Sequence, residues 1–205
     1  MLKVRALECR RGASLLMSDF NMSLEAGQLI HLQGANGTGK TSLLRIISGL
    51  STQETGKVLW NDVDIRTARE DYSSNLIYIG HQPAIKDDLT VLENLTVSLK
   101  LNGVNVDIKR LGEALEVVGL ARRKNLPARV LSQGQRRRLS LARLWLDQRP
   151  LWILDEPFNA LDVQANKLLE ERLDQHLVSS GMCILTSHHT PNIDKKLLTE
   201  VSLGL

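Results

Sequence analysis

The chain has 205 residues, 42% of them hydrophobic, and a formal net charge of +3. This length and composition predict one folded domain with a sizeable core, and the mildly basic charge does not by itself indicate nucleic acid. Cys9 and Cys183 are too far apart for a metal motif, the first residues lack the apolar run of a secretory signal, and no stretch is long enough to span a bilayer.

The first clear element is the apolar run Leu29–Leu32, which predicts a buried strand. It leads into Gly34-Ala-Asn-Gly-Thr-Gly-Lys-Thr41, the pattern of a phosphate-binding loop, and a helical pattern then ends near Gly49. A simple glycine-rich turn is the alternative, which the strand before and the helix after disfavour. Glycines let backbone N–H groups turn toward an anion, and the helix N-terminus adds positive potential. We therefore predict ATP binding, with Lys40 at the β- and γ-phosphates and Thr41 on Mg²⁺. The predicted nucleotide-binding residues of this loop are Gly34, Ala35, Asn36, Gly37, Thr38, Gly39, Lys40, Thr41 and Ser42.

After a second predicted strand, Leu76–Ile79, the segment from Pro83 to about Asp147 has helical patterns and few strand signals. Thr90 followed by Glu93 predicts a capping box that opens a helix over Val91–Leu101. We predict a single domain, 1–205, in which an α/β body of about 1–82 and 148–205 carries an inserted helical lobe of about 83–147.

Within this lobe, Leu131-Ser-Gln-Gly-Gln135 opens a basic amphipathic helix. Taken alone, Ser132 and Gln135 predict only another capping box. The basic run that follows, Arg136-Arg-Arg138, is interpreted as a solvated helix face rather than a nucleotide contact.

A third apolar strand, Leu151–Leu154, ends in Asp155 and Glu156, and a fourth is predicted at Cys183–Leu185. Strands separated by helices predict an α/β fold with parallel pairing. Ligands of such sheets bind beyond the carboxyl ends of the strands, so Asp155 is placed to hold Mg²⁺ and Glu156 to act as general base. Two solvated acids at a strand end are the alternative, which the phosphate-binding loop disfavours.

Three short motifs follow predicted strands: Gln82, then Ala160-Leu-Asp162, then Thr186-Ser-His188. With these in order, the chain resembles the ATP-binding cassettes of the ABC family along its whole length. In this resemblance Gly34–Thr41 and Asp155-Glu156 correspond to the Walker A and B motifs. Leu131–Gln135 corresponds to the signature motif, with Gln133 where glycine is more usual. Arg10, Arg11 and Gly12 stand where the family usually has an aromatic ring on adenine.

The resemblance implies a P-loop NTPase (RecA-like) body with a mixed sheet and an inserted α-helical lobe. It implies an ATP-dependent head-to-tail homodimer, in which Ser132 and Gly134 contact the γ-phosphate held by the other chain and Asp162 belongs to the nucleotide site. His188 would touch the γ-phosphate, and Gln82 would join the metal and nucleotide site to the lobe. Glu156, His188 and Lys40 are then the catalytic residues.

Further segments, such as Ile79-Gly-His-Gln-Pro-Ala-Ile-Lys86, resemble the cytochrome c maturation ATPases, the ATP-binding subunits of haem exporters. That likeness implies a peripheral subunit at the cytoplasmic face of the bacterial inner membrane, bound to membrane-spanning subunits and serving haem delivery. No haem site is seen in the sequence, and no nucleic-acid partner is expected. The alternatives are an ATPase of another ABC exporter, a soluble ABC-type ATPase acting on nucleic acid or ribosomes, and a P-loop kinase or GTPase.

Overall fold

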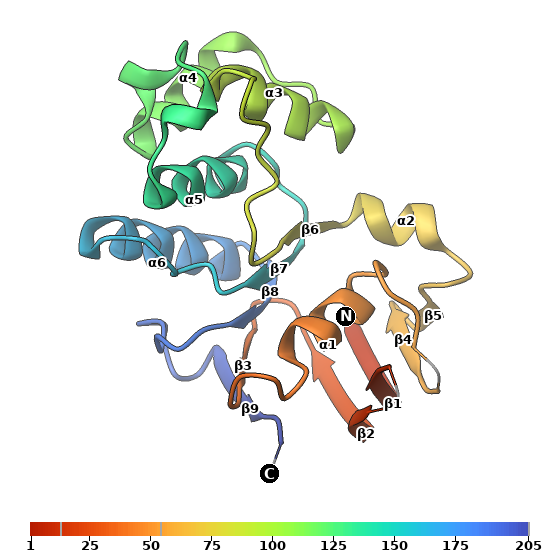
Figure 1. Ribbon diagram of the computed structural model, residues 1–205. Coiled ribbons are helices and arrows are strands. Elements are labelled where there is room, and N and C mark those ends of the chain that lie inside the picture. The colour runs from red at the N-terminus through yellow and green to blue at the C-terminus, as the bar shows by residue number, and fades with distance from the viewer. Residues whose placement is uncertain (13, 54, 205) are drawn as a thin grey trace. The chain divides into compact units, whose positions relative to one another are not determined.

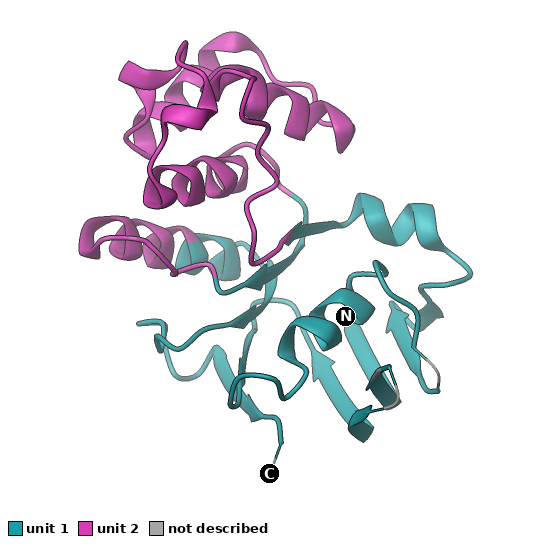
Figure 2. Cartoon of the chain, viewed as in Figure 1, with its two compact units in different colours: residues 1–78, 149–156, 173–205 teal, residues 79–148, 157–172 magenta. Residues whose placement is uncertain are grey.

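The computed structural model describes residues 1–12, 14–53 and 55–204, apart from the side chain of Arg11. By compactness the chain divides into two units, which Figure 2 colours separately. Unit 1 comprises residues 1–78, 149–156 and 173–205, and unit 2 comprises residues 79–148 and 157–172. The predicted lobe of about 83–147 lies within unit 2. No helix in the described ranges is both long and apolar enough to cross a membrane.

The described part of the chain contains both strands and helices, with a run of helical elements between β6 and β7 (Figure 1). In chain order they are β1 Leu2–Arg11, β2 Ser14–Leu24, β3 Leu29–Gln33, α1 Lys40–Ile47, β4 Lys57–Trp60, β5 Val63–Asp64, α2 Arg69–Ser74, β6 Leu76–Ile79, α3 Val91–Leu101, α4 Ile108–Val117, η1 Ala121–Arg123, η2 Ala128–Val130, α5 Gln133–Leu141, η3 Ala142–Trp145, β7 Leu151–Asp155, α6 Val163–Val178, β8 Met182–Thr186 and β9 Leu198–Ser202.

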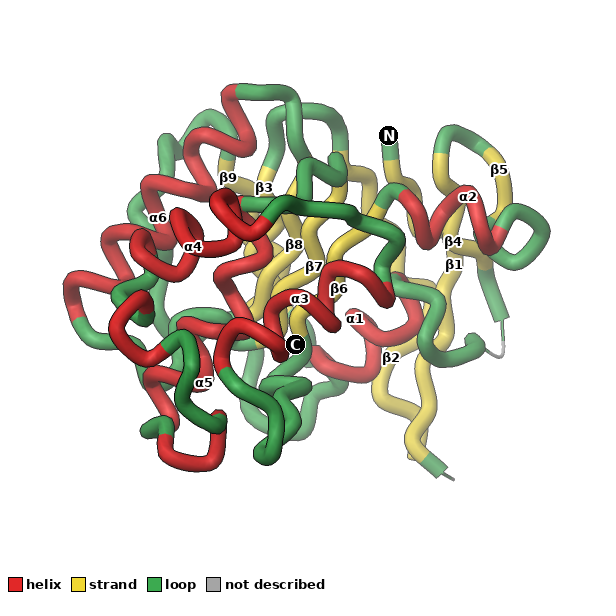
Figure 3. Tube along the Cα trace, turned by 90° about the horizontal axis from the view of Figure 1, so that it is seen from above, coloured by secondary structure: helices red, strands yellow, loops and turns green. Residues whose placement is uncertain are grey.

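The central sheet has the strand order β6-β7-β8-β3-β9, seen side by side in Figure 3. β3 runs parallel to β8 and β9, and β7 runs parallel to β8. Every residue of β7 and β8 is buried, as expected for strands covered on both faces. All four predicted strands belong to this sheet, and the α/β prediction is confirmed. Because β3, β7 and β8 are parallel, the segments that follow them emerge at one edge.

A second sheet, of order β2-β1-β4-β5, is antiparallel and contains strands that the sequence patterns did not indicate. The register between β1 and β2 shifts between Val4 and Leu7 and again around Cys9, and Ala6 has a φ of +45°. Such bulges interrupt the two-residue period by which strands are identified. The antiparallel strands are thus gathered in a sheet of their own.

The core of unit 1 lies between these two sheets. Helix α1 buries Leu43, Leu44, Ile46 and Ile47 in a cluster that includes residues of β1, β7 and β8. The helix ends at Ile47 with Ser48 as its C-cap, and Gly49 follows with a φ of +72°, so the predicted end near Gly49 is confirmed. This packing fixes the first turn of α1, which begins at Lys40, relative to the central sheet.

Unit 2 has its own apolar cluster, to which α3 and α4 contribute more residues than any other element. Both predicted capping boxes are present: Thr90 and Glu93 open α3, and Ser132 and Gln135 open α5. The basic helix that Ser132 opens is shorter than the helical segment, because α5 ends at Leu141 and the chain continues as the 3₁₀ turn η3. Hydrogen bonds spanning three residues, such as Leu146 N–H to the Arg143 carbonyl, tighten this last turn.

Candidate nucleotide site

The loop between β3 and α1 depends on glycine at three positions. Gly34, Gly37 and Gly39 have φ angles of +147°, +89° and +100°, which side chains rarely allow. A Cβ on Gly34 would also lie 2.7 Å from the Leu203 carbonyl oxygen. Gly39 is the N-cap of α1 and offers no side chain to its first turn. The N–H groups of that turn can therefore receive an anion.

Lys40 folds back over the same loop. Its Nζ donates to the carbonyl oxygens of Gly34 at 2.6 Å and Ala35 at 3.1 Å. Thr38 Oγ1 donates to the Ala35 carbonyl at 3.0 Å, which closes the turn from within. A full positive charge is thus held where the loop backbone and the helix N-terminus converge.

Thr41, Asp155 and Thr186 form a line of hydrogen bonds across the ends of α1, β7 and β8. Thr41 Oγ1 donates to Asp155 Oδ2 at 2.9 Å, and Thr186 Oγ1 donates to Asp155 Oδ1 at 2.8 Å. Asp155 is only 1% exposed, and its negative charge adds to burial in raising the pKa of Tyr78. A hydroxyl beside a carboxylate is a donor set that suits the hard cation Mg²⁺.

Glu156 follows Asp155 in a strained backbone conformation. Its φ is +50°, which costs a non-glycine residue about 1 kcal/mol or more. The Glu156 N–H donates to the backbone and side-chain oxygens of Thr186, at 3.1 and 3.0 Å. Glu156 Oε1 lies 3.7 Å from Nε2 of His188, whose side chain is 64% exposed. A buried carboxylate is thereby aimed toward an exposed imidazole, where it can accept a proton from a bound water.

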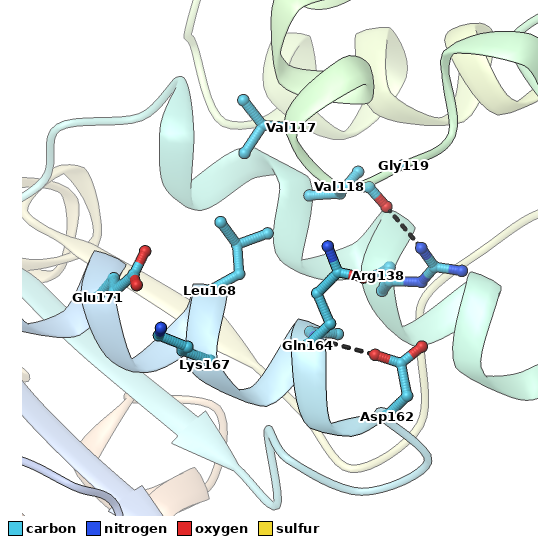
Figure 4. A pocket seen from close by; sticks show the side chains of 10 residues that line it. Val117, Val118, Gly119, Arg138, Asp162, Gln164, Lys167, Leu168 and Glu171 are labelled. Carbon is cyan, nitrogen blue, oxygen red and sulfur yellow. Dashed lines mark hydrogen bonds between the residues drawn. The ribbon is translucent and has the colours of Figure 1, made fainter.

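The other predicted residues belong to unit 2. Gln82 is exposed after β6, and Ser132 Oγ accepts from Gln135 N–H at 3.3 Å. A Cβ on Gly134 would lie 2.5 Å from the Ala160 carbonyl oxygen, so glycine is what lets α5 approach the segment before α6. Asp162 Oδ1 accepts from Ala165 N–H at 2.8 Å and caps α6, beside the pocket drawn in Figure 4.

Residues 17–159 match the family model described as ABC transporter. This chain belongs to the ABC transporter ATP-binding family. The cassette is 48% identical, over 94% of its length and 93% of the relative, to the cytochrome c biogenesis ATP-binding export protein CcmA of Methylococcus capsulatus. It is 50% identical to the protein of the same description in Nitrosomonas europaea, over 92% of its own length and 88% of that protein.

Solved cassettes share the fold. An ATP-binding subunit of an ABC transporter superposes with a TM-score of 0.88 at 26% identity, covering 99% of this chain and 85% of that one. A dimeric cassette in a post-hydrolysis state, bound to ADP and Pi, superposes with a TM-score of 0.83 at 21% identity, covering 100% of this chain and 97% of that one. These likenesses confirm the predicted P-loop NTPase fold. They do not test the roles assigned to individual residues, which stay predictions.

Within unit 1 the cassette brings together Thr41, Asp155, Glu156 and His188, all at the carboxyl edge of the central sheet. Thr186 joins them as the residue that bonds both Asp155 and Glu156. The sequence pattern included Thr186 only as a neighbour of His188. A threonine at the end of a buried strand beside the acidic strand is the signal that could have indicated it.

The basic run after the signature motif is not uniformly solvated, which corrects the expectation for Arg136-Arg-Arg138. Arg137 is 3% exposed and donates to the carbonyl oxygens of Pro157 and Gly80. Arg138 donates to the Val118 carbonyl at 2.9 Å, as Figure 4 shows. Carbonyls left without partners in unit 2 would be costly, and the guanidinium groups satisfy several at once.

The region that usually carries an adenine-stacking ring is only partly described. Arg10 pairs with Glu8, with Nε 2.6 Å from Oε1, and the side chain of Arg11 lies outside the described part of the chain.

Proposed function

We propose that this cassette is the ATP-hydrolysing, Mg²⁺-dependent subunit of a membrane complex that serves haem export or delivery in c-type cytochrome biogenesis. The hydrolytic part rests on one observation, the hydrogen-bonded line from Thr41 through Asp155 to Thr186 beside the phosphate-binding loop. The cargo and location rest on relatives described as cytochrome c biogenesis ATP-binding export proteins. The proposed location is the cytoplasmic face of the inner membrane, through membrane-spanning partners.

In this proposal each residue of the site has a separate role in binding or hydrolysing ATP. Residues Gly34–Ser42 hold the phosphates through backbone N–H groups, and Lys40 neutralises charge at the β- and γ-phosphates. Thr41 and Asp155 hold Mg²⁺, with Gln82 as a further contact. Bound Mg²⁺ would neutralise phosphate charge. Glu156 accepts the proton of the attacking water, and His188 contacts the γ-phosphate and helps to orient that water.

A second copy of the chain completes the site in this proposal. One of the structurally similar cassettes is a dimer bound to ADP and Pi. Head-to-tail pairing would bring Ser132 and Gly134 of the partner to the γ-phosphate, where the N-terminus of α5 offers the same anion-binding physics as α1. Asp162 would lie at this shared nucleotide. Pairing then depends on ATP, because the nucleotide forms much of the contact.

Substituting Glu156→Gln tests the proposal, because an amide keeps the shape of the side chain but cannot accept the water's proton. We expect ATP affinity to stay near wild type while turnover falls by about 10²–10⁴-fold. Because the bound ATP is not hydrolysed, the variant should accumulate as a dimer. Sedimentation should show this dimer with ATP but not with ADP. Glu113→Gln, on the exposed face of α4, is the matched control and should behave as wild type. Near-normal hydrolysis by Glu156→Gln would remove this residue from the role of base.

A further inference from the structure

A buried histidine lies in the strand that leads into the phosphate-binding loop. His31 is the middle residue of β3 and is 1% exposed. Its neighbours Ile30 and Leu32 face the apolar core of unit 1, so His31 points to the opposite face of the sheet. Its Nε2 lies 3.0 Å from the Ser187 carbonyl oxygen, one residue before His188.

The hydrogen bonds of His31 have a defined direction, which an exposed carboxylate sets. Glu200, the register partner of His31 on β9, accepts from Gln33 Nε2 at 2.8 Å. This orients the Gln33 amide, whose nitrogen also lies 3.3 Å from His31 Nδ1. Nδ1 is therefore the acceptor, and Nε2 carries the hydrogen that the Ser187 carbonyl, which can only accept, requires.

The acceptor in this bond belongs to the peptide that joins Ser187 to His188. Holding that carbonyl fixes the peptide plane from which the His188 backbone departs. A second hydrogen bond spans His188, because Ser187 Oγ accepts from the His189 N–H at 2.8 Å. The His188 side chain is itself 64% exposed, so its place 3.7 Å from Glu156 depends on this backbone more than on packing.

We propose that His31 is a positioning residue for ATP hydrolysis: through the Ser187 carbonyl it holds His188 beside Glu156. This inference rests on the proposed role of His188. It accounts for a polar side chain in β3, a strand whose other buried residues are aliphatic. It also connects Glu200 of β9, through Gln33 and His31, to the segment that carries His188.

The test compares His31→Leu, which removes the donor, with His31→Gln, whose amide N–H can replace it. His31→Leu should lower kcat roughly tenfold, because a small misplacement of a reacting group is costly. KM for ATP and calorimetric ATP affinity should stay within twofold of wild type. His31→Gln should recover most of kcat. Gln33→Leu, which loses the orienting amide but keeps the buried ring, should give a smaller fall in kcat and serves if His31→Leu does not fold.

A double-mutant cycle with His188→Ala separates positioning from stability. In that background His31→Leu or Gln33→Leu should change kcat by less than twofold, since the group that they position is gone. An equal loss of kcat in both backgrounds, or wild-type kcat in folded His31→Leu, would overturn the inference while leaving the role of His188 intact. Wild-type kcat in His188→Ala alone would instead overturn the proposed role of His188, and this inference with it.

Discussion

At the scale of single residues, Lys40 is the side chain that we expect to matter most for nucleotide affinity. Its Nζ donates hydrogen bonds to the carbonyl oxygens of Gly34 and Ala35, within the phosphate-binding loop. Lys40→Ala should lower ATP affinity at least tenfold, about 1.4 kcal/mol, through loss of that charge. Calorimetric titration measures this, with exposed Lys109→Ala on α4 as the control. Equal affinities in the two variants would contradict the assignment of the loop.

The same scale shows what sequence patterns can and cannot identify. The places of the phosphate-binding loop and Asp155 in the fold were predictable, because the loop lies between an apolar strand and a helical pattern and Asp155 ends another apolar strand. Arg137 was not, because an arginine in a basic run has the same sequence appearance whether it is solvated or buried. Its partners, Gly80 and Pro157, lie far away in the chain, and only the fold brings their carbonyls to one guanidinium.

At the scale of elements, the start of α3 depends on its capping box. Thr90→Ala should lower the free energy of unfolding by about 1 kcal/mol, whereas Thr90→Ser should keep most of it. Hydrogen bonds from the backbone and side chain of Thr90 lower the pKa of Glu93. The stability that these hydrogen bonds to the Glu93 carboxylate provide is present above the ordinary carboxyl pKa of about 4.3. It is lost as the pH falls through the lowered pKa that Glu93 has in the folded protein.

The difference between wild type and Thr90→Ala in urea unfolding should therefore be largest at neutral pH. It should shrink, without vanishing, below about pH 4, because the Thr90 hydroxyl also accepts from the Glu93 N–H whatever the charge on the carboxyl. Thr90→Ala keeps the backbone N–H that donates to Glu93, so a difference independent of pH would mean that the bond from the Thr90 hydroxyl to the Glu93 carboxylate contributes nothing to the cap.

Elements with a regular period were predicted well. The four predicted strands of the central sheet, β3, β6, β7 and β8, are mostly apolar runs, and α3 carries its own start signal. Strand β9, with the sequence LTEVS, has no such run and was not predicted. Strands β1 and β2 were missed because their bulges interrupt the alternation, and their partners are set by contacts across the sheet rather than by local sequence. The division of the helical pattern near Leu141 likewise follows from packing, which decides where an α-helix tightens into a 3₁₀ turn.

At the scale of the whole molecule, the proposed membrane subunits require a docking surface on the cassette. The segment after Gln82 is our candidate, since it leads from the nucleotide motifs into α3. Its backbone is fixed: the Lys86 N–H donates to Asn94 Oδ1 at 2.8 Å, and Asn94 Nδ2 returns to the Lys86 carbonyl at 3.0 Å. Asn94 is 7% exposed and belongs to α3, so this bond pair anchors the segment to that helix.

The two side chains that this backbone presents differ in their surroundings. Ile85 packs against the apolar cluster of unit 2, whereas Lys86 is exposed. Replacing Ile85 by Ala should therefore lower the melting temperature, and any loss of partner binding in that variant would be ambiguous. Lys86→Glu should leave both the melting temperature and the ATP affinity unchanged, since it touches neither the core nor the phosphate-binding loop.

We predict that Lys86→Glu nonetheless reduces membrane association of the cassette and the assembly of c-type cytochromes, because reversing a charge at a docking surface weakens encounter and complementarity. Lys109→Glu makes the same change in charge on α4 and should reduce neither membrane association nor cytochrome assembly. Fractionation of membranes from cells expressing each variant, with haem staining of the cytochromes, measures both effects. A Lys86→Glu variant that melts normally, stays fully membrane-bound and supports wild-type cytochrome levels would contradict this prediction. The docking surface would then lie on another part of the cassette than the segment after Gln82.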